Sequence, residues 1–334
     1  MRKKAAWLAG ILLILAVAAG LAGVFWKLNT KINNLSQTVA RMQEGTETYG
    51  RLSYIPELHP QGGGWLVTQF GDAQQNQEMC YTVTTDTGLV IIDGGWEYEE
   101  PRLRRIMEQY GNCVEAWILT HPHPDHMTAF LDIYQDLQGI RINHVYTPEF
   151  PELATLEANA SWDDYTLLEQ FRSLEIGGLE YLHKGDTRDI LGLKLEVLSA
   201  YDDTIDELSN DLLNDGSLMF RLSGDEESIL FCADVGSAGA KRADVRKRLT
   251  DYFLSEYGGL LKSDYVQMAH HGFGGLDEPF YRAVDPRASF FDAPAWLMDG
   301  SDPDRNTLEK TALIRDMGKA GFTYYTAPNQ ILLR

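Results

Sequence analysis

Residues 120–126 read Thr-His-Pro-His-Pro-Asp-His, and they directly follow the apolar run 114–119. The stretch places three imidazoles and one carboxylate within six residues, and these groups are the ligands that borderline divalent metals prefer. Side chains alternate along an extended strand end, so His121 and His123 point the same way, towards one metal ion. The pattern predicts a metal site at the point where a strand ends.

The second half of the same stretch turns the chain into a helix. Pro124 is compatible with the first turn of a helix, because the amide hydrogen that proline lacks has no helical partner there. The turn directs Asp125 and His126 into the same cleft from another angle, towards a second metal ion. A chance histidine-rich loop is the alternative, and the presence of three of the chain's eight histidines at this spacing argues against it.

This arrangement is the HxHxDH motif of the metallo-β-lactamase superfamily, which the chain resembles over residues 64–292. Other marks of the family follow in order at residues 89–95 (LVIIDGG), 231–236 (FCADVG) and 267–272 (QMAHHG). The resemblance implies an α/β fold, the αβ/βα four-layer sandwich in which two mixed sheets carry helices on their outer faces. It also implies two divalent metal ions, with zinc expected first and manganese or iron as alternatives.

The same resemblance implies roles for individual residues. Asp93 corresponds to an acid that supports the histidine loop from behind, and Asp234 to the acid that bridges the two metals. His270 corresponds to the last ligand, while His271 is a pocket residue or an alternative ligand. We take Asp125 and His271 as the catalytic residues, with His271 as the candidate proton donor to the leaving group.

Residues 214–220 (NDGSLMF) stand where many members of the family carry a lone third histidine. With residues 184–186 and 193–198, this stretch resembles the hydrolase domain of the DNA-uptake competence protein (ComEC type). The chain departs from that type because its last motif ends in Phe273, its bridging acid follows an alanine, and a single membrane span is predicted instead of a channel. The resemblance therefore supports the site and does not support DNA uptake.

Two interpretations of Asp215 stay open with equal weight. It is either an oxygen ligand that replaces the missing histidine, with Asn214 as a supporting residue, or part of an Asn-Asp-Gly turn before a strand.

The N-terminus predicts a membrane anchor. Residues 5–26 carry no charge, and about 20 apolar residues suffice for a helix to cross a bilayer. Three basic residues precede this signal-anchor, so residues 1–4 are expected in the cytoplasm and the body outside the cell membrane, with cleavage of the span as the alternative. Residues 27–60 form a stalk or linker, in which a short heptad pattern over 28–42 either pairs two copies of the chain or marks a plain amphipathic linker. The hydrolase domain is expected over 61–334.

Hydrophobic patterning within that domain alternates short strands with helices. Strands are expected at 65–70, 79–84, 89–92, 114–119, 193–198, 218–222, 229–232 and 265–268, and helices at 101–110, 165–174, 243–257 and 306–320. The acidic stretches 150–164 and 201–216 are expected to be surface loops.

The chain carries a formal net charge of −20, and its first 27 residues contain four basic residues and no acid, which leaves −24 on the rest. Such a body repels long polyanions, which argues against a protein that wraps nucleic acid without excluding nucleic acid altogether. A small anionic substrate held by metal ions remains compatible with this charge.

These observations predict a metallohydrolase in which two ions, bridged by Asp234, share a hydroxide that attacks the substrate. The first hypothesis is a phosphoester or phosphodiester hydrolase acting outside the membrane. The alternatives are hydrolysis of a lactone, thioester or β-lactam by the same site, and a non-catalytic membrane-anchored binding protein.

Overall fold

The computed structural model describes residues 31–32, 35–36, 50, 52–236, 242–302, 305, 307–325 and 327–334. No helix among these residues is long and apolar enough to cross a membrane. The predicted span 5–26 and much of the predicted stalk 27–60 lie outside the described residues. The chain divides into two compact units, residues 1–50 and 51–334.

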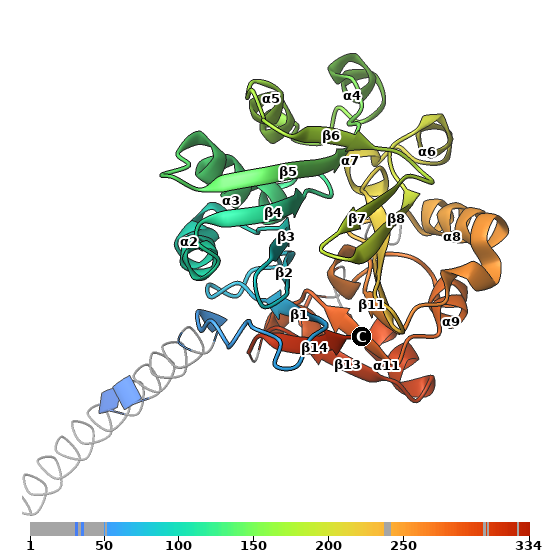
Figure 1. Ribbon diagram of the computed structural model, residues 1–334. Coiled ribbons are helices and arrows are strands. Elements are labelled where there is room, and N and C mark those ends of the chain that lie inside the picture. Colours follow the sequence, from blue (N-terminus) through green and yellow to red (C-terminus); the bar gives the residue numbers. More distant parts are fainter. Residues whose placement is uncertain are drawn as a thin grey trace, which may run out of the picture. The chain divides into compact units, whose positions relative to one another are not determined.

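The second unit contains two seven-stranded sheets (Figure 1). The first has the order β14-β1-β2-β3-β4-β5-β6, with β1 Trp65–Phe70, β2 Cys80–Thr84, β3 Leu89–Asp93, β4 Cys113–Ile118, β5 Arg141–Pro148, β6 Leu179–Leu182 and β14 Asn329–Leu333. The second has the order β13-β12-β11-β10-β9-β8-β7, with β7 Thr187–Ile190, β8 Leu193–Ser199, β9 Met219–Ser223, β10 Ser228–Phe231, β11 Tyr265–Gln267, β12 Ala288–Phe291 and β13 Ala320–Thr323.

The two sheets repeat one plan. In the first, β1 to β3 are antiparallel and β3 to β6 are parallel. In the second, β7 to β10 are antiparallel and β10 to β13 are parallel. In each sheet, antiparallel pairing changes to parallel pairing at one strand, β3 in the first sheet and β10 in the second. The parallel neighbours of these strands are β4 and β11.

Helices connect and cover the strands. They are α2 Glu100–Gln109, α3 Pro124–Gln135, α4 Leu153–Asn159, α5 Thr166–Arg172, α6 Asp203–Leu208, α7 Leu212–Asp215, α8 Ala243–Tyr257, α9 Glu278–Val284, α10 Ala295–Met298 and α11 Leu308–Asp316, with short 3-10 helices η1 Glu97–Glu99, η3 Gly258–Leu261 and η4 His270–Gly272. In Figure 1, α2 and α3 lie outside the first sheet, and α8 and α9 lie outside the second.

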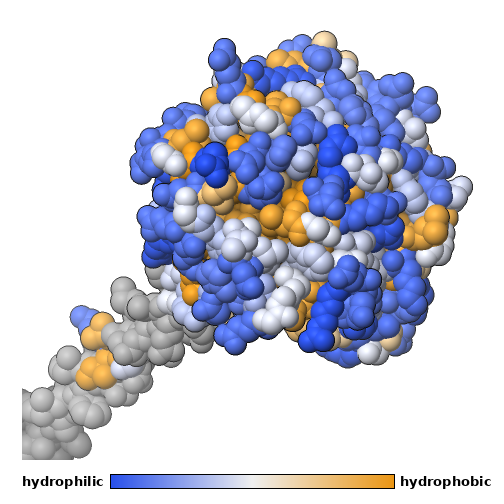
Figure 2. Space-filling view, viewed as in Figure 1, coloured by the Kyte–Doolittle hydropathy of each residue, from blue (hydrophilic) through white to orange (hydrophobic). Residues whose placement is uncertain are grey.

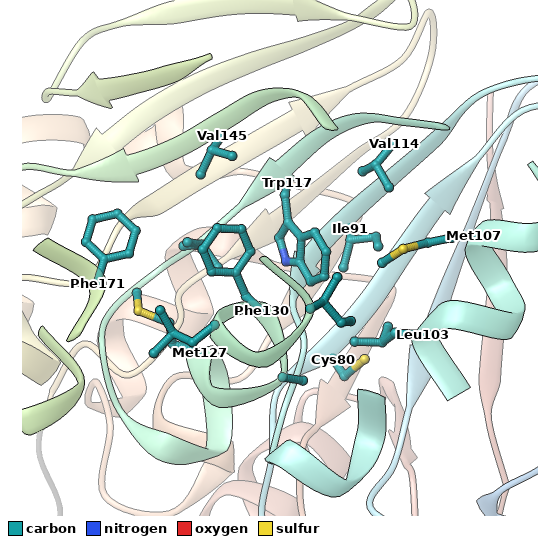
Figure 3. Close-up of a cluster of buried hydrophobic side chains, with 14 of the residues drawn as sticks. Cys80, Ile91, Leu103, Met107, Val114, Trp117, Met127, Phe130, Val145 and Phe171 are labelled. Carbon is teal, nitrogen blue, oxygen red and sulfur yellow. The ribbon is translucent and has the colours of Figure 1, made fainter. Parts of the chain in front are cut away.

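Three separate apolar clusters make this a four-layer sandwich. The first lies between the first sheet and its helices, where Trp117 of β4 meets Phe130 of α3 edge to face at 5.0 Å (Figure 3). The second lies between the two sheets, where Tyr81 of β2 meets Phe231 of β10 at 5.2 Å. The third packs Phe253 of α8 under the second sheet. Three buried interfaces require four layers, which confirms the predicted sandwich of two mixed sheets with helices outside.

Strand β3 shows why the sequence folds this way. Leu89 and Ile91 face the helical cluster, whereas Val90 and Ile92 face the cluster between the sheets. A strand with both faces covered is apolar without a break, which is the pattern that the sequence carries here. Figure 2 shows the complement, with hydrophilic residues over the helical surfaces and a band of apolar residues where the two sheets face each other.

The expectation of surface loops at 150–164 and 201–216 is wrong, because these stretches contain α4, α6 and α7. The backbone N–H of Ile205 donates to the Asp202 carboxylate at 2.9 Å, which caps α6, and Ile205 itself is buried. The acidic composition of 201–216 is thus that of a capped helix with one buried face.

Candidate metal centre

Four segments from the two sheets meet at one place. Residues 120–126 follow β4 and lead into α3, and Asp93 ends β3, the parallel neighbour of β4. Asp234 follows β10, and His270–His271 follow β11, the parallel neighbour of β10. Parallel neighbours end at the same edge of their sheet, so each sheet supplies two adjacent strand ends to the site.

Asp93 fixes the histidine loop. Its carboxylate accepts hydrogen bonds from the backbone N–H and the hydroxyl of Thr120, both at 2.7 Å, and lies 2.7 Å from Nδ1 of His126. The Thr120 hydroxyl also lies 3.1 Å from Nδ1 of His121. All four side chains are fully buried. These contacts hold Nδ1 of both imidazoles, which leaves Nε2 of each ring for the centre of the site.

His123 is held in the opposite sense. Its Nε2 lies 3.2 Å from a carboxylate oxygen of Asp163, and its Nδ1 lies 3.1 Å from Nε2 of His121. Because Asp163 contacts Nε2 of His123, the other ring nitrogen, Nδ1, is the one that faces His121 and the site. A carboxylate that binds the outer nitrogen of a histidine is the usual support for a metal ligand.

The free ring nitrogens converge on the Asp234 carboxylate. They lie at 3.4 Å for His126, 3.3 Å for His271, 3.8 Å for His270 and 3.9 Å for His121. Nε2 of His271 also lies 3.3 Å from the Asp125 carboxylate. At this centre, two groups of side chains present ligand atoms close enough for one ion each, His121 with His126 and Asp234, and Asp125 with His126 and His271.

Buried atoms without partners test whether these residues fit metal ions. Within the part of the chain that the structure describes, Nε2 of His126, Nε2 of His271 and Oδ1 of Asp234 are buried and accept or donate no hydrogen bond. A buried polar atom without a hydrogen-bond partner costs free energy. Three such atoms around one centre fit a site where their lone pairs would face a bound cation. Burial by itself would raise the pKa of Asp234, but the His271 and His126 imidazoles lower it well below its ordinary value, which keeps it ionised.

The contacts favour the alternative in which His271 is a ligand. Nδ1 of His271 lies 3.1 Å from the Asp292 carbonyl oxygen and that of His270 lies 3.0 Å from the Phe273 carbonyl oxygen, so both present Nε2 to the site. His271 is fully buried within a ligand group, whereas His270 is 8% exposed and lines the cavity. Of the two rings, His271 thus belongs to a candidate ligand group, while His270 lines the cavity with its Nε2 3.8 Å from the Asp234 carboxylate.

Asp215 does not join either ligand group. One of its oxygens accepts from the Gly236 backbone N–H at 2.6 Å, and the other accepts from the Ser209 hydroxyl. Burial raises its pKa to about 7, with the charge of Asp211 adding to the effect. The ligand interpretation of Asp215 is thus not supported by its contacts, which instead hold the segment after Asp234. Asn214 lines the cavity.

Backbone strain is concentrated at the site. Asp93, Ala233, His270 and His271 have φ values of 53°, 46°, 52° and 56°, in the left-handed region that side chains other than glycine disfavour. Gly272 follows at φ 90°, where a Cβ atom would lie 2.3 Å from the ring of Phe291. Strain of this kind persists only where surrounding contacts impose it, and here it turns consecutive side chains towards one centre.

A cavity of about 290 Å³ opens onto these groups. Its lining includes residues that the sequence did not single out as site residues, namely Gln77, Trp162, Asp211, Arg242 and Arg305. Gln77 donates from Nε2 to the Asp125 carboxylate at 2.9 Å. No local pattern marked these residues, because each belongs to a loop whose position depends on the rest of the fold.

A third acidic group lies outside the cavity lining. Asp72, Glu78 and Glu99 are buried together, and Arg102 lies among them, 3.0 Å from Glu78 and 2.8 Å from Glu99. The guanidinium pairs with two of the three acids, and burial raises the pKa of Glu78 and of Glu99, so the group is an ion-pair cluster with reduced negative charge. It anchors the loop that carries Gln77.

Comparisons with known proteins agree with this geometry. The sequence matches the family model described as Metallo-beta-lactamase superfamily over residues 74–264. No match is found among curated proteins. The fold is similar to that of CmlA, a diiron β-hydroxylase from Streptomyces venezuelae, with a TM-score of 0.52 and 14% identity, over 82% of this chain and 55% of that one.

Two further solved structures are more distant. The metallo-β-lactamase fold protein YhfI from Bacillus subtilis has a TM-score of 0.49 and 10% identity, over 79% of this chain and 98% of that one. A diphosphatase from the PhnP family has a TM-score of 0.43 and 14% identity, over 77% of this chain and 85% of that one. Similarity at these identities concerns the fold and does not identify a substrate.

Proposed function

The chain belongs to the metallo-β-lactamase superfamily, and from this premise we propose that it is a metal-dependent phosphodiesterase that acts outside the membrane. That it is a metallohydrolase follows from the family together with the buried His and Asp ligand groups. The substrate class, the metals and the membrane location are the proposal.

The observation that carries the choice of substrate is the pair of arginines in the cavity. Arg242 and Arg305 line the same cavity as Asp125, Asp234 and the histidines. A guanidinium matches the oxygens of a phosphate in geometry and charge. Its interaction with the substrate is strongest where the substrate is anionic in both the ground state and the transition state. A lactone, thioester or β-lactam ring offers no such charge at the scissile bond. The similarity of residues 214–220 to the ComEC-type hydrolase supports the same choice.

The chain's own residues have separable tasks. Six side chains would hold two divalent ions, zinc first: His121, His123, His126, His271, Asp125 and Asp234. Bound ions of this kind supply activation of water near neutral pH and polarisation of a phosphoryl oxygen.

The remaining residues position and bind. Asp93 and Asp163 set the ring orientation of the histidine loop, and Gln77 orients the Asp125 carboxylate. Arg242 binds the non-bridging phosphate oxygens. His270, at the cavity wall, donates from Nδ1 to the Phe273 carbonyl, so its inward Nε2 accepts a hydrogen bond from a group bound in the cavity.

We also infer that residues 5–26 anchor the enzyme in the cell membrane with the catalytic domain outside. The two described seam positions of the stalk, Ile32 and Leu35, are 59% and 65% exposed, which supports pairing of two copies through residues 28–42. Protease added to intact cells should degrade the catalytic domain, and its full protection would refute this topology.

Turnover of a substrate panel tests the proposed chemistry. Bis(p-nitrophenyl) phosphate should be hydrolysed by the zinc-loaded chain, and the rate should fall to background after dialysis against a chelator and return with zinc. The acyl arm contains p-nitrophenyl acetate, a homoserine lactone and a cephalosporin. Acyl turnover without phosphodiester turnover would overturn the proposal. The matched control is Asp316→Asn, a change of one exposed acid far from the ligand groups.

A further inference from the structure

A second cavity adjoins the metal cavity, and the two share one pair of side chains. The outer cavity has a volume of about 710 Å³, and both cavities are lined by Trp162 and Arg242. The guanidinium of Arg242 lies over the indole of Trp162 at 4.9 Å. A molecule that reaches from the metal centre into the outer cavity must therefore pass these two side chains.

Trp162 differs from the other aromatic residues near the motifs. Trp96 and Trp296 donate their indole N–H to backbone carbonyls at 2.8 and 3.0 Å, and Phe150 and Phe273 are buried, so these four anchor their loops. Trp162 is 56% exposed. An indole held at a cavity mouth with most of its surface open is suited to contact with a ligand.

The pair is held in place relative to the metal centre. Asp163, the next residue after Trp162, contacts Nε2 of His123 at 3.2 Å, which ties this loop to the ligand-bearing loop. Arg242 donates to the Asn210 side-chain oxygen at 2.8 Å, and this contact fixes the guanidinium beside the indole. A binding site on rigidly supported side chains costs little ordering free energy when a ligand arrives.

The charges of the outer cavity restrict what it takes. Its described lining contains two acids and two arginines, so they balance. Arg248 is paired with Asp244 at 2.8 Å and also donates to the Leu208 carbonyl at 2.9 Å. Arg242 lies 3.9 Å from the Asp211 carboxylate and lines the metal cavity, where its guanidinium can also meet a phosphate. A neutral polar ring fits this surface better than a further anionic group, which would meet Glu207 and Asp244.

We propose that Trp162 and Arg242 form a subsite for the second ester group of a phosphodiester, and that this group is a nucleoside or a similar neutral ring system. The inference rests on the proposed phosphodiesterase activity. Arg242 contacts the phosphate oxygens, and the ring stacks on the exposed indole in the outer cavity. Base stacking on an aromatic side chain is tolerant of base identity, so the subsite selects for a ring and not for a sequence.

Two substrates with the same leaving group test the subsite. Thymidine 5′-(p-nitrophenyl phosphate) and methyl p-nitrophenyl phosphate both release p-nitrophenolate, and they differ only in the second ester group. The full zinc-loaded chain should prefer the thymidine ester in kcat/KM. In Trp162→Ala that preference should fall about tenfold, the effect of losing one base stack, and Trp162→Phe should recover part of it.

The control is Tyr181→Ala, which removes another exposed aromatic residue that lines neither cavity and should leave the preference unchanged. Calorimetric titration of thymidine 5′-phosphate gives an independent reading, since Trp162→Ala should weaken this binding by a similar factor. An unchanged preference in Trp162→Ala, with both esters hydrolysed, overturns the subsite and leaves the phosphodiesterase standing. Failure of the unaltered chain to hydrolyse either ester overturns both the subsite and the proposed phosphodiesterase activity.

Discussion

Replacement of Asp93 by asparagine should weaken metal binding without unfolding the protein. The carboxylate of Asp93 accepts from two groups of Thr120 and faces Nδ1 of His126, each at 2.7 Å. An asparagine fills the same volume and keeps one accepting oxygen for the Thr120 backbone. Its amide group, however, places N–H donors where the carboxylate oxygen was.

The consequence reaches both first-motif histidines. To avoid a clash of donors, Nδ1 of His126 must accept a hydrogen bond, so the proton moves to Nε2, the atom that faces Asp234. The Thr120 hydroxyl then accepts from the new amide, so its own proton no longer goes to residue 93 and is donated to Nδ1 of His121. Both rings are driven towards the tautomer that cannot bind a cation with Nε2.

Loss of such an outer partner costs about 10- to 100-fold in metal affinity, or roughly 1.4–2.7 kcal/mol. The assay is competition for zinc against a chromophoric chelator, with circular dichroism to verify the fold. Asp215→Asn is the matched control, because it replaces another fully buried acid that lies outside both ligand groups. Zinc affinity within twofold of the unaltered chain in a folded Asp93→Asn protein would refute the tautomer argument.

Three further predictions concern neighbouring residues. His271→Ala should lower the number of zinc ions per chain measured by mass spectrometry, whereas His270→Ala should retain them and lower kcat; loss of zinc only in His270→Ala would contradict the assignment. Because burial raises the pKa of Asp215 to about 7 in the folded chain, the folded state binds more protons than the unfolded state between about pH 4 and 7, so the free energy of unfolding should fall as the pH rises through this window, by up to about 4 kcal/mol. Denaturant titrations of Asp215→Asn should show a flatter profile there, and an identical profile would exclude this residue as its source. Gly272→Ala should destabilise the chain by about 1–3 kcal/mol in thermal melts, since φ is 90° and the new Cβ would meet the Phe291 ring at 2.3 Å; an unchanged melting temperature would show that the turn relaxes freely.

The sequence alone was sufficient to predict those strands whose pattern lies in neighbouring residues. The apolar run before residues 120–126 and the unbroken apolar run 89–92 are properties of neighbouring residues, and the corresponding strands and the sandwich are where the patterns predicted them. The choice between His270 and His271 as the last ligand could not be made from the sequence, because it depends on backbone angles that the residue types do not reveal. Both residues adopt left-handed backbone angles, and these angles decide which ring is buried among the carboxylates.

Contacts between distant loops could not be predicted in this way. Asp163 is 40 residues from His123, and Gln77 is 48 residues from Asp125. Both lie in loops of mixed polar composition, where Asp and Gln are ordinary residues. Their partners are fixed only when the sheets and helices have packed, so a single sequence carries no sign of them.

The last strand of the chain has a bearing on when the enzyme can finish folding. Strand β14 pairs along β1, and Asn329 donates to the side chain of Gln69, a residue 260 positions earlier in the sequence. Until β14 has been synthesised and paired, β1 is an open edge whose unpaired amides can join another chain. Contacts of such long range form slowly, so completion of this sheet is expected to be a late event in folding. Early termination of synthesis would leave a product prone to aggregate even though its histidine loop is intact.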